Sequence, residues 1–397
     1  MEFQLSPEDE AFRQELRRFL REEVPLEKTG VLSSMYESDE AGGDEIALEI
    51  RKKLARKGWL TMGWPKEYGG QAASPLRQTI FMEEMSYWDA PGMDLMGVGI
   101  VGPTIMRIGT EAQKKQHLNA IAQGEVIWSQ GFSEPEAGSD LGSLQTRADL
   151  KGDVFVVNGQ KIWSSGAHRA DYLFLLARTD QDAPKHKGIS ALLVDLKNTR
   201  QGIDIRPIIN MAGMKGFNEI FFDNMEVPRE NLLGELNQGW YYAMGLLESE
   251  RSTFINFSAI GRNVIEGLVR LVNDPNALGV ASAKKPETRA KLADAAIENK
   301  VARNLALNVA WMASNGLRPS HQASIAKVFG SETFKRLAWS AMAIVGLYGQ
   351  IQHQKQYAPL MGRVNSIYYT SVGMTIAGGS SEIQRNVIAT RGLGLPR

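Results

Sequence analysis

The spacing of apolar residues changes twice along the chain, and this change constrains the fold more than any other feature of the sequence. Apolar residues recur at helical spacing up to about residue 123, in short strand-like runs from there to about residue 235, and at helical spacing again to the end. Helices and strands require different periods, so each change predicts a domain boundary. The sequence therefore predicts an α+β fold, mostly α, with a helical domain over 1–123, an antiparallel β-domain over 124–235 and a helical bundle over 236–397.

Cap residues and prolines indicate where the helices begin and end. Ser6 is a typical N-cap, Pro7 fits the first helical position, and acidic residues follow in the first turn, where the helix dipole favours them. Prolines at positions 275, 286, 319 and 359 are expected to separate four or five long helices in the last part, because proline cannot continue a helix. Further helices are expected over residues 44–57, 75–87 and 101–122.

Short runs rich in β-branched and aromatic residues fill the middle part. Residues 154–157 and 161–163 flank the pair Asn158-Gly159, which is typical of a tight hairpin turn because both residues tolerate positive φ. The connections between the runs are too short for crossover helices, so antiparallel pairing is expected. The other strands are expected over residues 172–177, 189–195, 203–207 and 219–227.

Charge and composition argue against several kinds of function. The chain carries 45 Lys and Arg against 45 Asp and Glu, so no net charge attracts nucleic acid or a membrane surface, and any bound anion needs local cationic groups. It has no cysteine, and its five histidines are scattered without a pair at ligand spacing, so no metal site is expected. No apolar run approaches the roughly 20 residues that span a bilayer, and no secretory signal pattern is present, so a cytoplasmic location is expected.

Two segments of the middle part combine small, hydroxyl and aromatic side chains. The segment Gly131–Asp140 carries Ser133 and Ser139 among glycines that let a ligand approach the backbone, although a plain surface loop has the same composition. A second segment, KIWSSG, places Trp163 beside Ser165, so that an indole face and a hydroxyl could meet a planar ring and its polar edge. A tryptophan buried in the core is the alternative for Trp163.

A third segment, near the C-terminus, leads into a helix. Gly378 and Gly379 precede Ser381 and Gln384, which stand at the spacing of a capping box. A glycine turn before a helix N-terminus is a natural place for phosphate groups, because unpaired N–H groups and the helix dipole favour negative charge. An ordinary capped helix without a ligand is the alternative.

Together these segments resemble the acyl-CoA dehydrogenase family over essentially the whole chain. The matching stretches are GWPKEYGG at 63–70, FSEPEAGSD at 132–140, NGQKIWSSG at 158–166, NEIFFDNMEVP at 218–228 and GGSSEIQRNVIATRGLG at 378–394. The resemblance implies an FAD-dependent enzyme that oxidises an acyl-CoA thioester to its trans-2-enoyl product and passes electrons to electron-transfer flavoprotein. The alternatives are an oxidase that reduces oxygen, and a base-bearing or structural subunit of a heteromer.

The resemblance also implies which residues contact FAD and which contact the substrate. Trp163 is expected to flank the isoalloxazine ring, with Ser165 aimed at its N5 edge, while Phe132 and Ser133 meet the pyrimidine side. Ser139 is expected near the CoA part of the substrate or the flavin phosphates. The remaining FAD contacts are expected from Ser380, Ser381 and Glu382, and the remaining substrate contacts from Arg251 and Gly379.

The general base departs from the commonest family pattern. In many members a carboxylate stands immediately before the Gly-Ser/Thr-Ser run, where this chain has Gly378, which cannot take a proton. Another branch of the family carries its glutamate on the first long helix of the C-terminal domain, directly before an arginine, and Glu250-Arg251 fits that pattern. Glu250 is therefore the expected base for the α-proton, because Glu248 lies two residues away and points roughly opposite on a helix.

Two further features bear on the substrate and the assembly. Gly97, Gly99 and Gly102 are compatible with a wide pocket for a branched, aromatic or polycyclic acyl group, with close helix packing as the alternative. The Arg-x-x-Phe-Gly segment, through which many members reach the FAD of a neighbouring subunit, is absent from residues 273–288. The sequence leaves open a homo-oligomer, dimer or tetramer, and a heterotetramer with a second acyl-CoA dehydrogenase-like chain.

Overall fold

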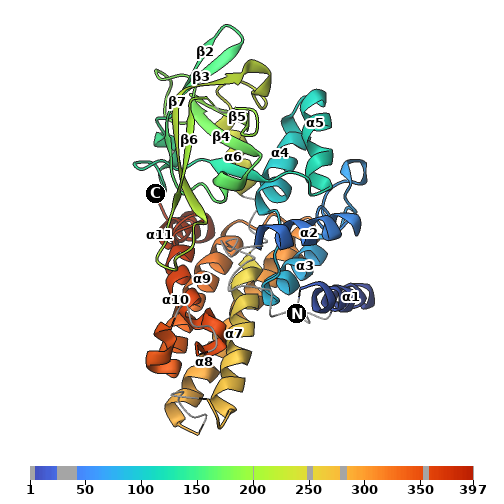
Figure 1. The fold of residues 1–397 in the computed structure, drawn as a ribbon, viewed down its shortest axis with the longest axis vertical. Helices are drawn as coiled ribbons and strands as arrows, with labels where there is room; N and C mark the ends of the chain where they lie inside the picture. Colours follow the sequence, from blue (N-terminus) through green and yellow to red (C-terminus); the bar gives the residue numbers. More distant parts are fainter. Residues whose placement is uncertain are drawn as a thin grey trace. The chain divides into compact units, whose positions relative to one another are not determined.

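The computed structural model describes residues 5–24, 43–199, 201–247, 254–277, 284–351 and 357–396 (Figure 1). The chain divides into two compact units. The helical unit comprises Met1–Met35, Ala73–Pro91 and Arg251–Arg397, and the sheet unit comprises Tyr36–Ala72 and Gly92–Glu250. Some of the N-terminal helices belong to the helical unit and the others to the sheet unit. This division does not test the predicted domain boundaries near residues 124 and 236, which remain predictions.

Serine-proline pairs begin two helices of the helical unit. Ser6 caps α1 by accepting a hydrogen bond from the Asp9 N–H at 3.1 Å, and Ser74 caps α3 through the Arg77 N–H at 3.2 Å. A proline fits the first turn of each helix, because its missing N–H would have no partner there. The helices of this unit are α1 (Pro7–Glu23), α3 (Pro75–Tyr87), α7 (Ile255–Asn273), α8 (Pro286–Ser314), α9 (His321–Val345), α10 (Arg363–Met374) and α11 (Ser381–Val387). Within the described part of the chain, no helix combines the length and the apolar character needed to cross a membrane.

Buried carboxylates join α3 to α1 and α8. Glu83 and Glu84 of α3 are each only 1% exposed. Arg303 of α8 donates hydrogen bonds to Glu83 at 2.5 and 3.0 Å, and Arg17 of α1 donates two to Glu84 at 2.9 and 2.8 Å. Burial would raise the pKa of Glu83, but the hydrogen bonds and charge of Arg303 hold it below its ordinary value. The helical unit can bury these charges because each one faces a guanidinium.

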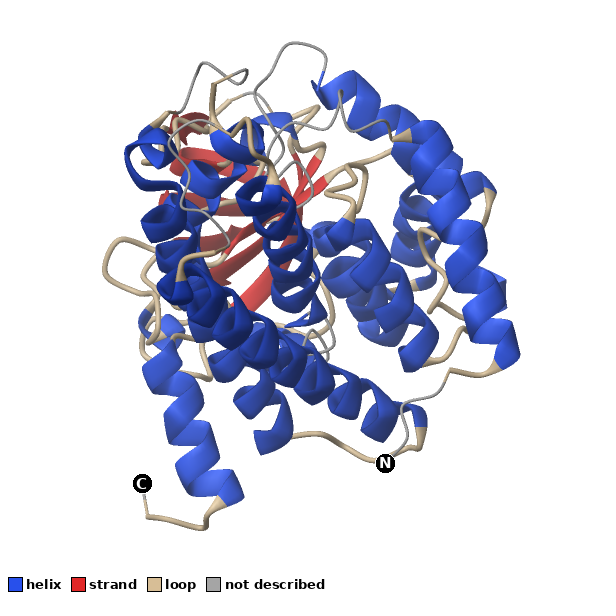
Figure 2. Ribbon diagram, turned by 90° about the horizontal axis from the view of Figure 1, so that it is seen from below, coloured by secondary structure: helices blue, strands red, loops and turns tan. Residues whose placement is uncertain are grey.

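The sheet unit is organised around one sheet of seven strands, drawn in red in Figure 2. The strand order is β1-β4-β2-β3-β7-β6, and β5 pairs with β4. Most neighbours are antiparallel as expected, but β1 runs parallel to β4, and β2 meets β4 in parallel at Arg147 and Arg178. The strands are β1 (Trp128–Gly131), β2 (Arg147–Lys151), β3 (Val154–Lys161), β4 (Tyr172–Arg178), β5 (Ile189–Asp195), β6 (Ile203–Ile208) and β7 (Phe217–Pro228), and the helices are α2 (Gly43–Arg56), α4 (Gly102–Ile108), α5 (Glu111–Ala122) and α6 (Gly239–Leu247). The predicted α+β class, mostly helical with a β-domain in the middle of the chain, is confirmed.

Side chains of β4 alternate between two apolar cores. Phe174 and Leu176 belong to the core that also contains residues of α4 and α5, while Leu173, Leu175 and Ala177 belong to the other. Successive side chains of a strand point to opposite faces, so β4 is buried on both. This explains its nearly continuous apolar sequence, which lacks the polar alternation of a half-exposed strand.

The predicted hairpin turn at Asn158-Gly159 is wrong. β3 runs through both residues, and the register with β7 shifts between Val157 and Gly159. Gly159 has a φ of 145°, and a Cβ there would lie 2.7 Å from the Thr146 Cα, so the glycine serves a close approach of two backbones. The turn between β2 and β3 lies instead at residues 152–153, where Gly152 has a φ of 61°. The register shift places Asp223 and Asn224 of β7 opposite the single residue Asn158, and Asn224 has a φ of 51°. The extra residue of this β-bulge therefore lies on β7, and the Asn-Gly pair faces it from β3.

Candidate functional site

Two segments predicted to contact a ligand lie side by side in the sheet unit. Phe132 and Ser133 follow the end of β1, and Ile162 and Trp163 follow the end of β3. The Ile162 N–H donates to the Ser133 carbonyl oxygen at 2.9 Å, although β1 and β3 are not neighbours in the sheet. Phe132 is buried and meets Phe174 edge-on, with ring centroids 5.4 Å apart. The structure thus brings Ser133 and the Trp163 segment together where these two strands end.

Trp163 is not a core residue. It is 54% exposed, and its φ of 62° is uncommon for a tryptophan. Its ring meets Phe217 edge-on, with centroids 5.9 Å apart. The exposed Ser165 lies two residues further, and its carbonyl oxygen accepts a hydrogen bond from the Ser129 hydroxyl at 2.8 Å. An open aromatic face with a hydroxyl close to it in the chain fits a planar ring that has a polar edge, which is the chemistry of a flavin.

Asn218 of β7 fixes this segment, and no role was predicted for it from the sequence. Its buried side chain donates to the Ser164 carbonyl oxygen at 2.8 Å, and the Ser164 N–H donates to the Asn218 carbonyl oxygen at 3.1 Å. Its Oδ1 lies 2.9 Å from Nδ1 of His168. An asparagine inside a strand with buried apolar neighbours is the available sequence signal, because a buried amide requires hydrogen-bond partners.

A buried ion pair lies directly behind the two segments. Lys161 is fully buried, and its ammonium donates to the Phe132 carbonyl oxygen at 3.0 Å and to Glu134 Oε1 at 2.8 Å. Burial lowers the pKa of Lys161 to about 8, against the opposing effect of Glu134. Burial would raise the pKa of Glu134, but Lys161 and the N–H groups of Gln145 and Thr146 keep it below its ordinary value. Neither residue was predicted to have a role, although both stand inside the stretches that resemble the family.

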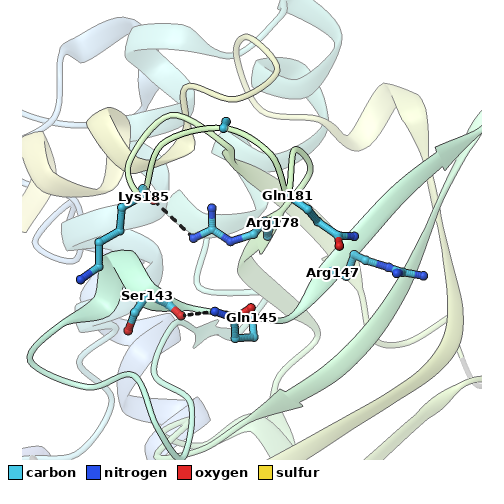
Figure 3. Close-up of a pocket in the computed structure, with 7 residues that line it drawn as sticks. Ser143, Gln145, Arg147, Arg178, Gln181 and Lys185 are labelled. Carbon is cyan, nitrogen blue, oxygen red and sulfur yellow. Dashed lines mark hydrogen bonds between the residues drawn. The ribbon is translucent and has the colours of Figure 1, made fainter.

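Ser139 is exposed on the loop that continues from Glu134, and it is not among the residues that line the polar cavity shown in Figure 3. Asp140, its neighbour in sequence, forms a salt bridge with Lys185, which lines the cavity. The cavity has a volume of about 670 Å³ and is lined by Ser143, Gln145, Arg147, Arg178, Gln181, Ala183 and Lys185. Three cationic side chains in one cavity supply the local positive charge that an anionic ligand needs in a chain without net charge.

The glycine turn of the helical unit precedes α11 as expected, but the cap is displaced by one residue. Gly378 and Gly379 have φ values of 65° and 84°. Ser380, not Ser381, caps the helix, and its hydroxyl accepts from the Ile383 N–H at 3.4 Å. The side chain of Gln384 donates to the Gly378 carbonyl oxygen at 3.0 Å, so it closes the turn and does not complete a capping box with Ser381. The predicted capping box is therefore wrong.

Polar groups around this turn differ in their pairing. Glu382 is exposed, and its own N–H and the Ser380 hydroxyl lower the pKa of its carboxyl group. Ser381 is buried, and its hydroxyl has no partner among the described residues. Lys327 of α9 is 1% exposed, its ammonium makes no hydrogen bond to the described chain, and burial lowers its pKa to about 8 despite the charges of Glu332 and Glu382.

The glycines expected to widen an acyl pocket serve more than one purpose. A Cβ at Gly102 would lie 2.1 Å from the Trp64 ring, so this glycine permits close packing, as the alternative interpretation proposed. A Cβ at Gly97 would lie 2.2 Å from the Asp94 carboxylate. Gly99 has nothing within 4 Å of a Cβ and faces open space. Only Gly99 therefore remains compatible with a pocket wall in the sheet unit.

Glu250 and Arg251 lie outside the described residues, as does Glu248. The assignment of the general base to Glu250 therefore remains a prediction from the sequence. The remaining candidate residues fall into two groups. One lies in the sheet unit and contains Phe132, Ser133, Ser139, Trp163 and Ser165, and the other lies in the helical unit and contains Gly379, Ser380, Ser381 and Glu382.

Comparison with known proteins gives matches along the whole chain. Residues 6–125, 129–225 and 237–393 match the N-terminal, middle and C-terminal domains of acyl-CoA dehydrogenase, respectively. Acyl-CoA dehydrogenase IpdE1 of Mycobacterium tuberculosis is 34% identical over 398 residues, which cover 98% of each chain. Among solved structures, the Tcur3481-Tcur3483 steroid ACAD has a TM-score of 0.89 at 34% identity, and the ChsE4-ChsE5 complex from Mycobacterium tuberculosis has one of 0.88 at 32% identity, each over all of both chains.

These matches, together with the helix, sheet and helix order, show that the chain belongs to the acyl-CoA dehydrogenase family. Members of this family are FAD-dependent oxidoreductases, so the predicted enzyme class and cofactor are confirmed. The open indole of Trp163 and the nearby hydroxyls of Ser133 and Ser165 suit that cofactor. The roles given to individual residues remain predictions.

Proposed function

We propose that the protein oxidises an acyl-CoA thioester to the trans-2-enoyl-CoA, with FAD as its cofactor. The observation that carries the proposal is the meeting of the Phe132–Ser133 and Ile162–Trp163 segments, through the hydrogen bond from Ile162 to Ser133. This contact gathers an exposed indole, two hydroxyls and several backbone groups in a small region of the sheet unit. A flat aromatic face near polar groups suits the isoalloxazine ring of FAD, which is planar and has a polar edge.

The proposed division of roles follows from the chemistry of the side chains. FAD, when bound, supplies the two-electron acceptor for the β-hydrogen. Trp163 covers the ring system, and Ser133 and Ser165 hydrogen-bond its edge. Glu250 removes the α-proton, a task that suits a carboxylate whose basicity rises when the acyl chain excludes water. Ser380, Ser381 and Glu382 hold a more distant part of FAD.

The polar cavity that contains Arg147, Arg178 and Lys185 is proposed to take the phosphate groups of CoA. Arg147 and Lys185 line it, and each is partly exposed, with a carboxylate neighbour that a phosphate could replace, namely Asp149 and Asp140. Arg178 is held in place by the Leu144 and Gly142 carbonyl oxygens at 2.9 and 2.8 Å. A fixed guanidinium together with two exposed cations suits a polyanion such as the phosphate groups of CoA. Arg147→Gln should therefore raise the KM for acyl-CoA more than it lowers kcat.

The role of Glu250 is tested by adding acyl-CoA anaerobically to the purified yellow protein. The flavin absorbance should bleach in the wild type and should persist in Glu250→Gln with FAD retained, because the amide cannot accept the α-proton. Glu248→Gln is the matched control and should bleach as the wild type does. Bleaching at the wild-type rate in Glu250→Gln would exclude Glu250 as the base.

The electron acceptor distinguishes a dehydrogenase from an oxidase. We propose electron-transfer flavoprotein as the acceptor, on the family resemblance. Reduced enzyme should be reoxidised quickly by added electron-transfer flavoprotein and slowly by air. Stoichiometric peroxide at each turnover would instead identify an oxidase.

A polycyclic acyl group is the proposed substrate class, in a heteromeric assembly. The similarity to the Tcur3481-Tcur3483 steroid ACAD and to the ChsE4-ChsE5 complex supports both parts. The open space at Gly99 and the missing Arg-x-x-Phe-Gly segment agree with them. A panel of steroid side-chain and straight-chain acyl-CoA thioesters tests the first part. The number of flavins per chain in native mass spectrometry tests the second, because a homotetramer with complete sites carries one FAD per chain.

A further inference from the structure

The hydrogen bonds of the sheet do not by themselves fix the spacing between the ends of β1 and β3. β1 is hydrogen-bonded to β4, and β3 to β2 and β7, so no ladder joins β1 to β3. The residues proposed to contact FAD nevertheless follow these two ends, and their spacing must be held within a fraction of an ångström for a shared ligand. Two hydrogen bonds link these parts of the chain, from the Ile162 N–H to the Ser133 carbonyl oxygen and from the Ser129 hydroxyl to the Ser165 carbonyl oxygen. Neither of them holds the Phe132 backbone to the end of β3.

Lys161 and Glu134 supply that connection. The Lys161 ammonium reaches from the last residue of β3 to the Phe132 carbonyl oxygen and the Glu134 carboxylate. Glu134 in turn accepts from the Gln145 N–H at 2.6 Å and the Thr146 N–H at 2.8 Å, just before β2 begins. One ion pair therefore ties three segments of backbone that no common ladder unites.

The side chain of Lys161 lies in a closely packed part of the core. A Cβ at Gly131 would lie 3.5 Å from the Lys161 Cγ and 3.0 Å from a Leu175 methyl group, so the stem of the lysine passes over a glycine in a filled core. The close approach at Gly159 brings β3 against Thr146, whose hydroxyl donates to the Gln160 carbonyl oxygen at 3.2 Å. A lysine in this setting has little freedom, and its charge is held at one point.

We propose that the Lys161–Glu134 ion pair is the positioning device of the flavin site. It fixes the Phe132–Ser133 and Ile162–Trp163 segments in their spacing, and it thereby sets the affinity and the environment of bound FAD without touching the cofactor. The proposal rests on the assignment of these segments to FAD under the proposed function. A salt bridge that only stabilised the fold would not change the affinity for FAD.

The test removes the charges while keeping the shapes. In the double variant Lys161→Met with Glu134→Gln, the methionine fills the lysine volume, and the glutamine oxygen still accepts from the Thr146 N–H. The matched control, Arg303→Met with Glu83→Gln, removes a buried ion pair of the helical unit that contacts none of the segments in question. Both are purified as expressed, with any chain that copurifies, and are titrated with FAD.

The positioning role predicts different outcomes for the two double variants. The Lys161/Glu134 variant should bind FAD more weakly by roughly tenfold to a hundredfold, by analogy with the loss of outer-shell partners around metal ligands. The visible circular dichroism of the flavin and its reduction potential should also change. The Arg303/Glu83 variant should melt at a lower temperature but keep the FAD affinity and the flavin spectrum. Unchanged FAD affinity, spectrum and potential in the Lys161/Glu134 variant would overturn this inference alone. A wild-type preparation that takes up no FAD would overturn the proposed function, and this inference with it.

Discussion

Two buried lysines, one in each unit, differ in whether their ammonium groups are hydrogen-bonded. Lys161 in the sheet unit is bonded to a carboxylate and a carbonyl oxygen, while the ammonium of Lys327 in the helical unit makes no hydrogen bond to the described chain. Burial nevertheless lowers the pKa of both to about 8. The two pKa values are similar because desolvation is the largest influence on each of them. They therefore do not reveal that one ammonium is hydrogen-bonded to the described chain and the other is not.

The difference between them shows what a buried charge can contribute. Lys161 orders backbone segments that the sheet does not join, so its desolvation is offset by bonds that it alone makes. Lys327 lies close enough to Glu332 and Glu382 to feel their charges, but it holds no backbone group in place. Replacing each lysine by methionine, which is similar in length and uncharged, should separate the two situations.

The largest effect is expected for Lys161→Met. The single change leaves the Glu134 carboxylate buried without its cation and the Phe132 carbonyl oxygen without its donor. Breaking a buried pair in this way costs about 3–5 kcal/mol of unfolding free energy. Urea unfolding followed by circular dichroism would measure the loss, and adding Glu134→Gln should recover part of it. A single variant as stable as the wild type would show that the pair contributes nothing to the fold.

The opposite sign is expected for Lys327→Met. A buried ammonium without a hydrogen bond destabilises the folded state, so its removal should be neutral or should stabilise the chain by about 1–3 kcal/mol. The same urea experiment measures it, and Lys335→Met on the same helix, where the lysine stacks over Trp339, is a suitable surface control. A loss of more than about 1 kcal/mol would mean that Lys327 has a partner in the assembled protein, and the comparison would then fail.

Much of the fold could be predicted from the sequence, because periodicity and caps are local. The starts of α1 and α3 follow from serine-proline pairs, and α3 has the predicted bounds, Pro75–Tyr87. The Asn158-Gly159 pair was misinterpreted for a physical reason. A two-residue type I′ turn requires positive φ at both residues, whereas only Gly159 of this pair has it. The pairing of β3 with β7 keeps the chain extended through both residues, and this pairing is not visible in the local sequence.

The candidate site was predictable in part for the same reason. Trp163 and Ser133 stand in recognisable stretches, but the Lys161–Glu134 pair joins the last residue of β3 to the loop after β1, and these two strands are not neighbours in the sheet. No spacing in the sequence therefore indicates the pair. A lone lysine is also expected at the surface. The burial of Lys327 was missed on the same ground, because its helix shows no sequence feature that separates a buried lysine from an exposed one.

The pH dependence of stability sharpens the Lys327 comparison. Its pKa is about 8 in the folded chain and 10.5 ordinarily, so below pH 8 both states are protonated and the full cost of burial is present. Between pH 8 and 10.5 the folded state binds fewer protons than the unfolded state, so the cost fades as the pH rises. The stability gained by Lys327→Met should therefore be largest near pH 7 and should vanish near pH 10.5.

Lys161 adds a pH dependence of the same sign to the unfolding free energy of both chains. It therefore cancels when the unfolding free energy of the wild type is subtracted from that of the variant. Urea unfolding at pH 7, 8, 9 and 10 would give the curve. A gain that stays constant over this range would mean that Lys327 titrates alike in both states, and that its pKa is not lowered in the folded protein.

The smallest change in stability is expected at two adjacent serines, of which one hydroxyl is hydrogen-bonded within the described chain and the other is not. Ser380 caps α11 through the Ile383 N–H, whereas the Ser381 hydroxyl is buried without a partner among the described residues. Ser380→Ala should cost about 1 kcal/mol, as the loss of a cap usually does. Ser381→Ala should cost nothing or stabilise slightly, because an unpaired hydroxyl leaves the core. Thermal unfolding measures both changes. A larger loss for Ser381→Ala than for Ser380→Ala would mean that the Ser381 hydroxyl has a partner that the isolated chain lacks. Repeating the measurement with added FAD, and then with a second chain, would identify that partner.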